Sequence, residues 1–360
     1  MNTAFTIFLM LYIAFMMLFV YVMICGNNKF HRNGLIGKIY RFITLTIPSF
    51  FTSLMKRICP KFCFSGQDDE DGSCTGPHGP CKYFVAFFFY IIYMFFSVTY
   101  LMKVYPNIPT IFNNHSENYI KFIKFFSLFV LPWPWVIFIL FQFLDPGEIR
   151  NDNVESYLKI YPYDYQLYFP KLCPTLNIPI VPRSRYCKYT NKRIAKYDHY
   201  CPWVLMPVGE RTHRLFILFL LSDIIVAGFY AYGCFMKLIW CFNINKYRIP
   251  TNEDKLDRFL YGFVLLFDTE PMTLAACVVL AVITAVLLIF LGQQFFYISH
   301  NILQIEQEKY EYLIELRRER ESTEPVMNYY DRGFIANWKS VLFPPKVPLH
   351  KPMKYKKKDE

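Results

Sequence analysis

Five apolar stretches, each long enough to cross a bilayer, constrain this chain more than any other feature. A helix needs about 20 apolar residues to span roughly 30 Å of hydrocarbon. The stretches lie at about 3–25, 83–102, 123–144, 215–240 and 272–298. With 54% hydrophobic, 20% aromatic and 19% charged residues, the chain is too apolar for a soluble domain. We therefore predict an all-α polytopic membrane protein with five transmembrane helices.

Polar and helix-breaking residues do not remove any of these stretches. The third contains Pro132 and Pro134, which a span tolerates when neighbouring helices or water satisfy the freed carbonyl groups. The fourth carries Asp223 and Lys237, and we expect Asp223 to face the bundle rather than lipid. No basic residue precedes the first stretch and Lys29 follows it, so we interpret it as a signal anchor rather than a signal peptide.

The distribution of basic residues predicts the orientation of the chain. With a lumenal N-terminus, the cytosolic segments hold 31 lysines and arginines and the lumenal loops hold six. Basic residues are enriched on the cytosolic side of membrane proteins, which favours this orientation. Asn114-His115-Ser116, an N-glycosylation acceptor sequence, then falls in a lumenal loop.

This orientation predicts the organisation of the whole chain. The segments are a lumenal N-terminus with the signal-anchor span (1–26), a cytosolic loop (27–82), span 2 (83–102), a lumenal loop (103–122), span 3 (123–144), a cytosolic catalytic segment (145–214), span 4 (215–240), a lumenal loop (241–271), span 5 (272–298) and a cytosolic tail (299–360). The net charge of +11 is concentrated on the cytosolic side, which suits an anionic lipid leaflet better than nucleic acid.

The tetrapeptide Asp198-His199-Tyr200-Cys201 has the residue types of a thiol active site. A nucleophilic cysteine needs a base or a cation beside it, because its thiol is mostly protonated at neutral pH; His199 can supply either. Asp198 can accept a ring N–H and fix the imidazole tautomer. A buried structural cysteine with a capping aspartate is the alternative. The position of Cys201 shortly before a span favours a thiol within reach of a lipid-derived substrate.

The surrounding residues resemble a known family. Asp198 to Val204 is similar to the D-H-H-C-P-W-V signature of the DHHC palmitoyltransferases, in its D-H-Y-C variant. Further matches are Asp145-Pro146-Gly147, Pro182-Arg183-Ser184-Arg185, Gly209 to Arg214 and Tyr330 to Trp338, so that the resemblance covers about residues 83–345. Residues 161–169 and Tyr330 to Asn337 look like the fungal endoplasmic-reticulum branch, which acylates SNAREs beside their membrane anchors.

The resemblance implies a two-step acyl transfer from palmitoyl-CoA to cysteines of membrane proteins, with SNAREs as expected substrates and the endoplasmic reticulum membrane as expected location. Carried onto this sequence, Cys201 is the acylated intermediate, His199 its base and Asp198 the orienting partner. Arg183 and Arg185 are expected to contact the phosphates of CoA, as arginine commonly does. Trp203 is expected near the acyl entrance, although a structural role is equally consistent with its position.

The family also binds two zinc ions through eight ligands in a cysteine-rich segment, and this chain departs from that pattern. Cys173 and Cys187 occupy two of the ligand positions. The other six hold Leu176, Tyr186, Thr190, Arg193, Tyr200 and Pro207. One cysteine per site cannot build a tetrahedral zinc site, so we predict no zinc here and expect apolar and hydrogen-bonded packing in its place. Of the family's Thr-Thr-x-Glu motif only Glu306 remains.

Four cysteines of the first cytosolic loop remain open to two interpretations. Cys59, Cys63, Cys74 and Cys81 do not have the spacing of a zinc knuckle. Cysteines close to a membrane are common acylation targets, and we assign them no metal.

Two other classes of function compete with an acyltransferase. Loss of the zinc ligands is consistent with a catalytically weak scaffold or SNARE-binding relative, although such a protein would not need a base beside a thiol. A transporter would call for paired or repeated intramembrane polar residues, and only Asp223 and Lys237 qualify.

Overall fold

The computed structural model describes residues 34–41, 81–245, 255–320 and 325–347. The chain forms two compact units. Of the described residues, one unit contains 34–41, 81, 235–245 and 255–275, and the other contains 82–234, 276–320 and 325–347. The predicted first span, the cysteines at positions 59, 63 and 74, and the basic end of the tail lie outside the described residues.

Four long apolar helical segments confirm a polytopic membrane protein. Within the described residues, the segments long and apolar enough to cross a bilayer are Ala86–Ile111, Glu117–Phe143, His213–Ile244 and Pro271–Ser299. They are built from α4 (Cys81–Lys103), η2 (Tyr105–Asn107), α5 (Ile108–Ile111), α6 (Glu117–Val130), α7 (Trp133–Phe143), α9 (His213–Asn245) and α11 (Pro271–Ser299). They correspond to the predicted spans 2 to 5.

The third predicted span is interrupted near its prolines. Ser116 caps α6, its hydroxyl accepting a hydrogen bond from the Tyr119 backbone N–H, and the helix ends at Val130. Pro132 and Pro134 then start α7, because proline tolerates the first turn of a helix and disrupts its interior.

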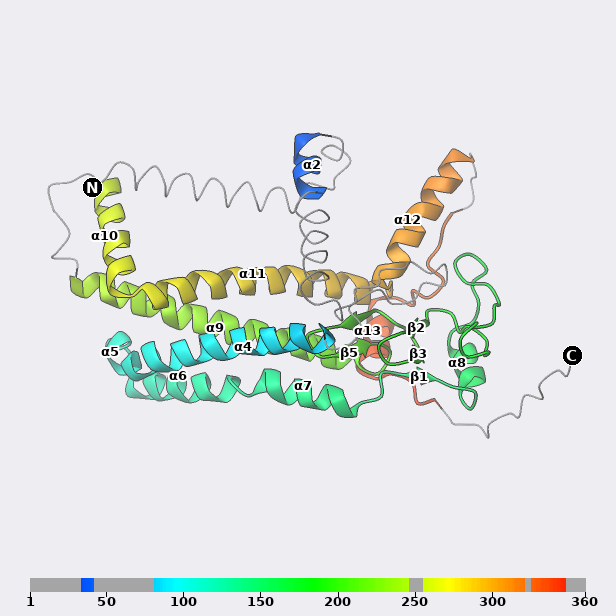
Figure 1. Cartoon of the computed structure of the whole chain (residues 1–360), viewed down its shortest axis with the longest axis horizontal. Helices are drawn as coiled ribbons and strands as arrows, with labels where there is room; N and C mark the ends of the chain where they lie inside the picture. The colour runs from blue at the N-terminus through cyan, green and yellow to red at the C-terminus, as the bar shows by residue number, and fades with distance from the viewer. Residues whose placement is uncertain (1–33, 42–80, 246–254, 321–324, 348–360) are drawn as a thin grey trace, which may run out of the picture. The chain divides into compact units, whose positions relative to one another are not determined.

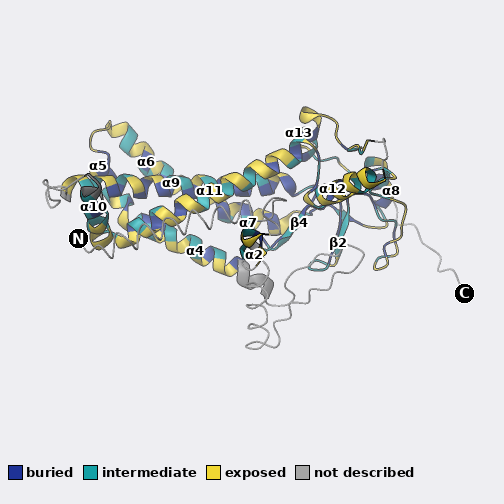
Figure 2. Ribbon diagram, turned by 90° about the horizontal axis from the view of Figure 1, so that it is seen from above, coloured by how far each residue is buried: buried dark blue, intermediate teal, exposed yellow. Residues whose placement is uncertain are grey.

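The outer faces of these helices are apolar and exposed (Figure 2). Large exposed side chains include Phe87, Phe95, Phe125, Val282 and Ile289. An exposed apolar surface of this extent is incompatible with water and is the surface that lipid tails would contact.

The smaller described unit contains α2 (Leu35–Arg41), the end of α9 and α10 (Lys255–Thr269). The predicted lumenal loop 241–271 therefore contains a helix. Glu270, which follows this helix, forms an ion pair with Lys237 of α9 at 2.8 Å. The pair compensates the lysine charge, which lipid tails could not do.

The segment 145–214 folds into short β-strands beside the helix ends. A three-stranded antiparallel sheet has the order β1 (Glu148–Ile149), β3 (Lys192–Ile194), β2 (Arg185–Cys187), and α8 (Val154–Ile160) lies between β1 and β2 in the chain. A separate hairpin pairs β4 (His199–Cys201) with β5 (Met206–Val208).

A turn after α7 ties these strands together. The Asp145 carboxylate accepts hydrogen bonds from the backbone N–H groups of Gly147 and Glu148, and Gly147 adopts a φ of +108°. The other carboxylate oxygen of Asp145 forms an ion pair with Arg211 at 2.8 Å. The Gly147 carbonyl in turn accepts the Ala195 N–H. The Asp-Pro-Gly motif thus holds the start of the segment against its end.

The tail begins after α11 and contains α12 (Gln304–Glu319) and α13 (Phe334–Leu342). Trp338 of α13 donates to Ser299 Oγ at 3.1 Å, which attaches the second tail helix to the end of α11.

Gly209 is required by close packing, and this leads to a testable prediction. A Cβ at this position would lie 2.7 Å from the Pro146 carbonyl oxygen and would overlap the Ile194 side chain. We expect Gly209→Ala to destabilise the protein by about 1–3 kcal/mol, as overpacking does. Gly292→Ala is the matched control, because its Cβ would meet nothing within 4 Å. Thermal unfolding in detergent would measure both, and equal midpoints for the two variants would contradict the packing constraint.

Candidate active site

Cys201 lies at the end of the β4 strand, against the transmembrane helices. Its side chain is 2% exposed and belongs to an apolar cluster with Ile137 and Phe141 of α7 and with Phe216 and Phe219 of α9. Hairpin pairing with Met206 fixes its backbone, and Gln142 of α7 donates to the Val204 carbonyl at 2.8 Å. The hairpin turn is therefore anchored to the helix ends.

Asp198, His199 and Cys201 form a connected polar run within this apolar setting. His199 Nδ1 is 2.8 Å from Asp198 Oδ2, and the imidazole also hydrogen-bonds the Cys201 side chain. The ring meets Phe216 edge-on, with 4.9 Å between centroids. The structure thus brings together all three residues that the sequence predicted as the catalytic group.

The charges of this run are set by mutual contact rather than by solvent. Burial alone would raise the pKa of Asp198, but its hydrogen bond and charge interaction with His199 lower that pKa to about 2. Burial opposes the imidazolium, yet the hydrogen bonds to Asp198 and Cys201 outweigh it and raise the pKa of His199 above its usual value. A carboxylate and an imidazolium are therefore the favoured forms at neutral pH.

The start of α12 also contacts this run. Asp198 accepts a hydrogen bond from the Gln304 backbone. No pattern in the sequence indicated Gln304, because a backbone donor carries no side-chain signature.

Trp203 borders an apolar cavity between the transmembrane helices. The cavity has a volume of about 240 Å³ and is lined by side chains of α4, α9 and α11, including Phe89, Tyr93, Asp223, Tyr230 and Leu287. Phe89 and Leu287 also pack against the cluster that contains Cys201. The Trp203 ring lies 5.5 Å from that of Phe89. The cavity and the thiol therefore share a wall, and Asp223 faces the bundle as expected.

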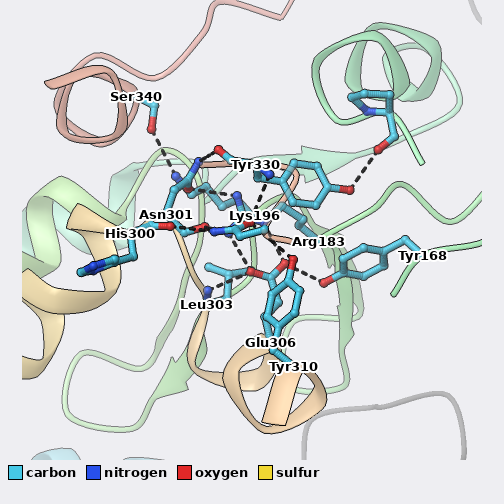
Figure 3. Close-up of polar contacts among 12 residues, drawn as sticks. Tyr168, Arg183, Lys196, His300, Asn301, Leu303, Glu306, Tyr310, Tyr330 and Ser340 are labelled. Carbon is cyan, nitrogen blue, oxygen red and sulfur yellow. Dashed lines mark hydrogen bonds and ion pairs between the residues drawn. The ribbon is translucent and has the colours of Figure 1, made fainter. Parts of the chain in front are cut away.

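Arg183 has a structural environment that differs from the predicted phosphate contact (Figure 3). Its side chain is fully buried, and it bonds both carboxylate oxygens of Glu306 at 2.8 and 2.9 Å. Two further hydrogen bonds go to the side chain and carbonyl of Asn301, and the guanidinium lies over the Tyr330 ring. All these donors are committed inside the protein. Arg185, by contrast, is only partly buried on β2.

Glu306 therefore makes a definite contact, although its motif is almost lost. It accepts a hydrogen bond from Tyr168 at 2.8 Å and one from the Leu303 backbone at 2.9 Å, in addition to the ion pair. Asn301 donates to the Tyr330 carbonyl, and Tyr330 donates to the Pro162 carbonyl. Asn337 donates to the Ser299 carbonyl at 2.8 Å. These contacts attach the tail to the end of α11 and to the segment 145–214.

The residues of the cysteine-rich segment do not fit a pair of zinc sites. Cys173 accepts a hydrogen bond from Arg193 Nη2 at 3.4 Å, and Arg193 stands at one of the family's ligand positions. Burial opposes ionisation of Cys173, but this hydrogen bond contributes to a lowered thiol pKa. Tyr200, at another ligand position, stacks on Tyr189 with 4.1 Å between ring centroids. In the described part of the chain, no three His, Cys, Asp or Glu side chains gather as metal ligands.

The fold and the site together define a class: polytopic membrane proteins with a Cys-His-Asp group beside an apolar cavity in the helix bundle. Comparison with known proteins agrees. The family profile described as DHHC palmitoyltransferase matches residues 166–311. The palmitoyltransferase swf1 of Schizosaccharomyces pombe is 24% identical over 92% of this chain and 95% of its own length. Palmitoyltransferase SWF1 of Yarrowia lipolytica is 23% identical over 79% of this chain and 85% of its own.

The palmitoyltransferase SWF1 of Saccharomyces cerevisiae is 29% identical over 45% of both chains. Residues 166–311 therefore match the DHHC palmitoyltransferase family, and the chain is similar over most of its length to these fungal palmitoyltransferases. It is an acyltransferase that uses palmitoyl-CoA.

The buried ion pair gives a quantitative prediction. Removing one partner of such a pair leaves an uncompensated charge, so we expect Glu306→Gln to cost about 3–5 kcal/mol of stability. The control is Lys192→Gln, which breaks the partly exposed Lys192–Glu148 pair and should cost less than about 1 kcal/mol. Unfolding temperatures in detergent would be compared, and similar losses in both variants would show that the Arg183–Glu306 pair is not a special constraint.

Metal content provides a second prediction. Because Arg193 and Tyr200 occupy ligand positions, we expect purified protein to contain no stoichiometric zinc and to keep its unfolding temperature in a chelator. Elemental analysis would measure the first property and a thermal scan the second. Two zinc ions per chain, or a large chelator-induced drop, would contradict our interpretation of this segment.

Proposed function

We propose that Cys201 carries the acyl group during palmitoyl transfer, with His199 and Asp198 as its activating partners. The observation that best supports this is the hydrogen-bonded run from Asp198 through His199 to Cys201. An imidazolium next to a thiol stabilises the thiolate, which is the nucleophilic form. Asp198 stabilises the imidazolium and orients the ring. The raised His199 pKa favours a preformed cation over a neutral base awaiting a proton.

The proposed reaction exchanges one thioester for another in each of two steps. In the first, the Cys201 thiolate attacks the carbonyl carbon of palmitoyl-CoA, the bond to the CoA sulfur breaks, and CoA leaves with the proton of His199. In the second, a substrate cysteine gives its proton to His199 and attacks the acyl-Cys201 carbonyl, and the Cys201 thiolate leaves. The cycle restores the ion pair and needs no oxidant or reductant.

The apolar cavity is the proposed place for the acyl chain. It shares Phe89 and Leu287 with the cluster around Cys201, and Trp203 lies at its border. Most of its lining is apolar or aromatic, which favours a hydrocarbon chain. Trp203 would then contact the acyl chain near the thioester.

For CoA itself, we retain Arg185 as a phosphate contact and leave out Arg183. Arg183 has all its contacts inside the protein, and moving it would break the pair with Glu306. Arg185 is partly exposed on β2, in the same small sheet as β3.

We further propose that segment 145–214 and the tail face the cytosol at the endoplasmic reticulum membrane. The charge asymmetry of the sequence supports the orientation. The likeness to the fungal branch supports the compartment and membrane-anchored substrates of the SNARE kind. A thiol buried against transmembrane helices favours substrate cysteines that lie close to a membrane anchor.

The alternative function is a scaffold that has lost its zinc sites together with its activity. Substitution of the six ligand positions favours it. The intact contacts among Asp198, His199 and Cys201 argue against it, because binding a partner requires no activated thiol.

Acyl labelling distinguishes these functions. Purified protein would be incubated with an alkyne analogue of palmitoyl-CoA, and hydroxylamine-sensitive label would be counted. We expect Cys201→Ser to abolish the thioester label and His199→Gln to slow its formation by at least about 100-fold, the usual scale of general acid–base contributions. Cys173→Ser is the control and should keep the label, because Cys173 pairs with Arg193.

If the amount of hydroxylamine-sensitive label is unchanged in both the Cys201 and the His199 variants, other cysteines are acylated passively, and the scaffold function is favoured. Each variant must still be recovered in the membrane fraction, so that loss of label reports chemistry rather than loss of protein.

A further inference from the structure

A second cavity, separate from the site around Cys201, lies between the catalytic segment and the tail. Its volume is about 500 Å³, and its walls come from the end of α8, the chain between β3 and β4, and α13. We call it the basic cavity, after the cations that line it together with Arg183: Lys159, Lys196, Arg332 and Lys339. Residues 198–203 do not line it.

The charge of the basic cavity is one-sided. Lys159, Arg332 and Lys339 are exposed at its rim, and no acidic residue stands among the described side chains that line it. Arg183 also lines the cavity, but its charge is matched by Glu306. Amide and hydroxyl groups from Asn301, Asn337 and Ser340 complete the polar wall. Several cations without a carboxylate raise the local concentration of anions.

Lys196 is the most unusual of these residues. It is 5% exposed, and its ammonium group donates to Ser340 Oγ at 3.3 Å (Figure 3). Within the described part of the chain, no carboxylate lies within 4 Å of it. Burial and the positive charge of Arg183 lower the pKa of Lys196 to about 7, despite attraction from Glu210, Glu306 and Asp198.

Each of the nearby carboxylates has another partner, although Glu210 Oε2 is buried without a hydrogen bond. Glu210 accepts the Tyr161 hydroxyl, Glu306 holds Arg183, and Asp331 accepts hydrogen bonds from Asn337 and the Gly333 backbone. An ammonium group buried without a counter-ion is costly, and an anion bound in the cavity would offset that cost.

We propose that the basic cavity binds a compact anion with two or more phosphate groups, such as a phosphorylated inositol ring, and that Lys196 contacts it. Phosphates carry more charge and more acceptor oxygens than a carboxylate of similar size, which suits several converging cations. The ring could be free in solution or the headgroup of a lipid, since both present the same chemistry. The inference does not depend on the proposed role of Cys201.

The position of the cavity gives such a ligand a structural effect. Lys159 belongs to α8, Lys196 follows β3, and Arg332, Lys339 and Ser340 belong to the tail. An anion bound among them would link α13 to the segment that carries Asp198, two residues beyond Lys196. Occupancy would therefore stabilise the attachment of the tail to the catalytic segment.

The test uses the purified full chain in detergent and myo-inositol 1,4,5-trisphosphate as the probe. A ligand that binds only the folded state raises the unfolding temperature in proportion to the logarithm of its concentration. We expect a concentration-dependent rise for the unchanged protein and for the control Lys171→Gln, an exposed lysine outside the cavity. The double variant Lys159→Gln/Lys339→Gln should lose most of the rise.

Lys196→Met separates binding from folding. Replacing an unpaired buried ammonium by an apolar side chain of similar length should keep or raise the unfolding temperature without the probe, and should abolish the response to it. If Lys196→Met and the rim variant respond as the unchanged protein does, or if the unchanged protein does not respond, the inference is wrong.

Two further arms identify the source of the phosphate. One arm is flotation of the protein with phosphatidylcholine vesicles that contain or lack phosphatidylinositol 4-phosphate. A lipid headgroup would be supported if Lys159 and Lys339 are required for binding to the vesicles that contain this lipid and not for binding to the others. A response to the free trisphosphate without that vesicle preference would support a soluble ligand. Displacement of the trisphosphate by CoA, which lacks the acyl chain, would assign the cavity to the substrate and overturn a separate site.

Discussion

The buried pair of Arg183 and Glu306 is the interaction on which the structure outside the membrane-spanning helices depends. It joins the catalytic segment to the start of α12, two parts of the chain separated by 123 residues. Because both side chains are fully buried, neither charge can be satisfied by water if the other moves. Asn301 and Leu303 then hold the turn that precedes α12. This turn places the Gln304 backbone against Asp198, so the ion pair indirectly positions the carboxylate beside His199.

Packing and hydrogen bonds engage the residues that stand at the zinc-ligand positions expected from the family resemblance. Arg193 supplies a positive charge to the Cys173 thiol, as a metal ion would, but it also donates to Ser184 and so links two parts of the segment. Tyr200 and Tyr189 replace a ligand contact by ring stacking. The turn at Asp145 closes the same region through Arg211. Several weak contacts at different places thus hold the chain segments together, whereas a zinc ion would do so at a single site.

The sequence predicted the helical elements well, because apolar runs of bilayer length have few other outcomes. Spans 2 to 5 follow from local patterns, but the third span was expected to continue through Pro132, where the structure interrupts it. Helix α10 was not predicted. Its sequence mixes charged residues such as Asp257 and Arg258 with apolar ones, and the segment 241–271 was assigned as a loop only because it lies between two predicted spans. The grouping of Asp198, His199 and Cys201 followed from their proximity in the chain. The environment of Arg183 could not be predicted, since Glu306 and Asn301 meet it only through the fold, and its motif suggested an exposed cation.

Burial of Cys201 has a consequence for which partners its thiol can meet. A side chain that is 2% exposed, among Phe141, Phe216 and other apolar neighbours, is poorly accessible to soluble thiols. Access from the apolar side is different, because the cavity beside Phe89 and Leu287 lies within the helix bundle. A long acyl chain that fills this cavity would bring its thioester to the thiol, whereas a short acyl chain would lose the apolar contacts that hold it there. With Cys201 as the proposed nucleophile, the burial that shields its thiol from water would favour a lipid donor and acceptor cysteines that lie close to the membrane.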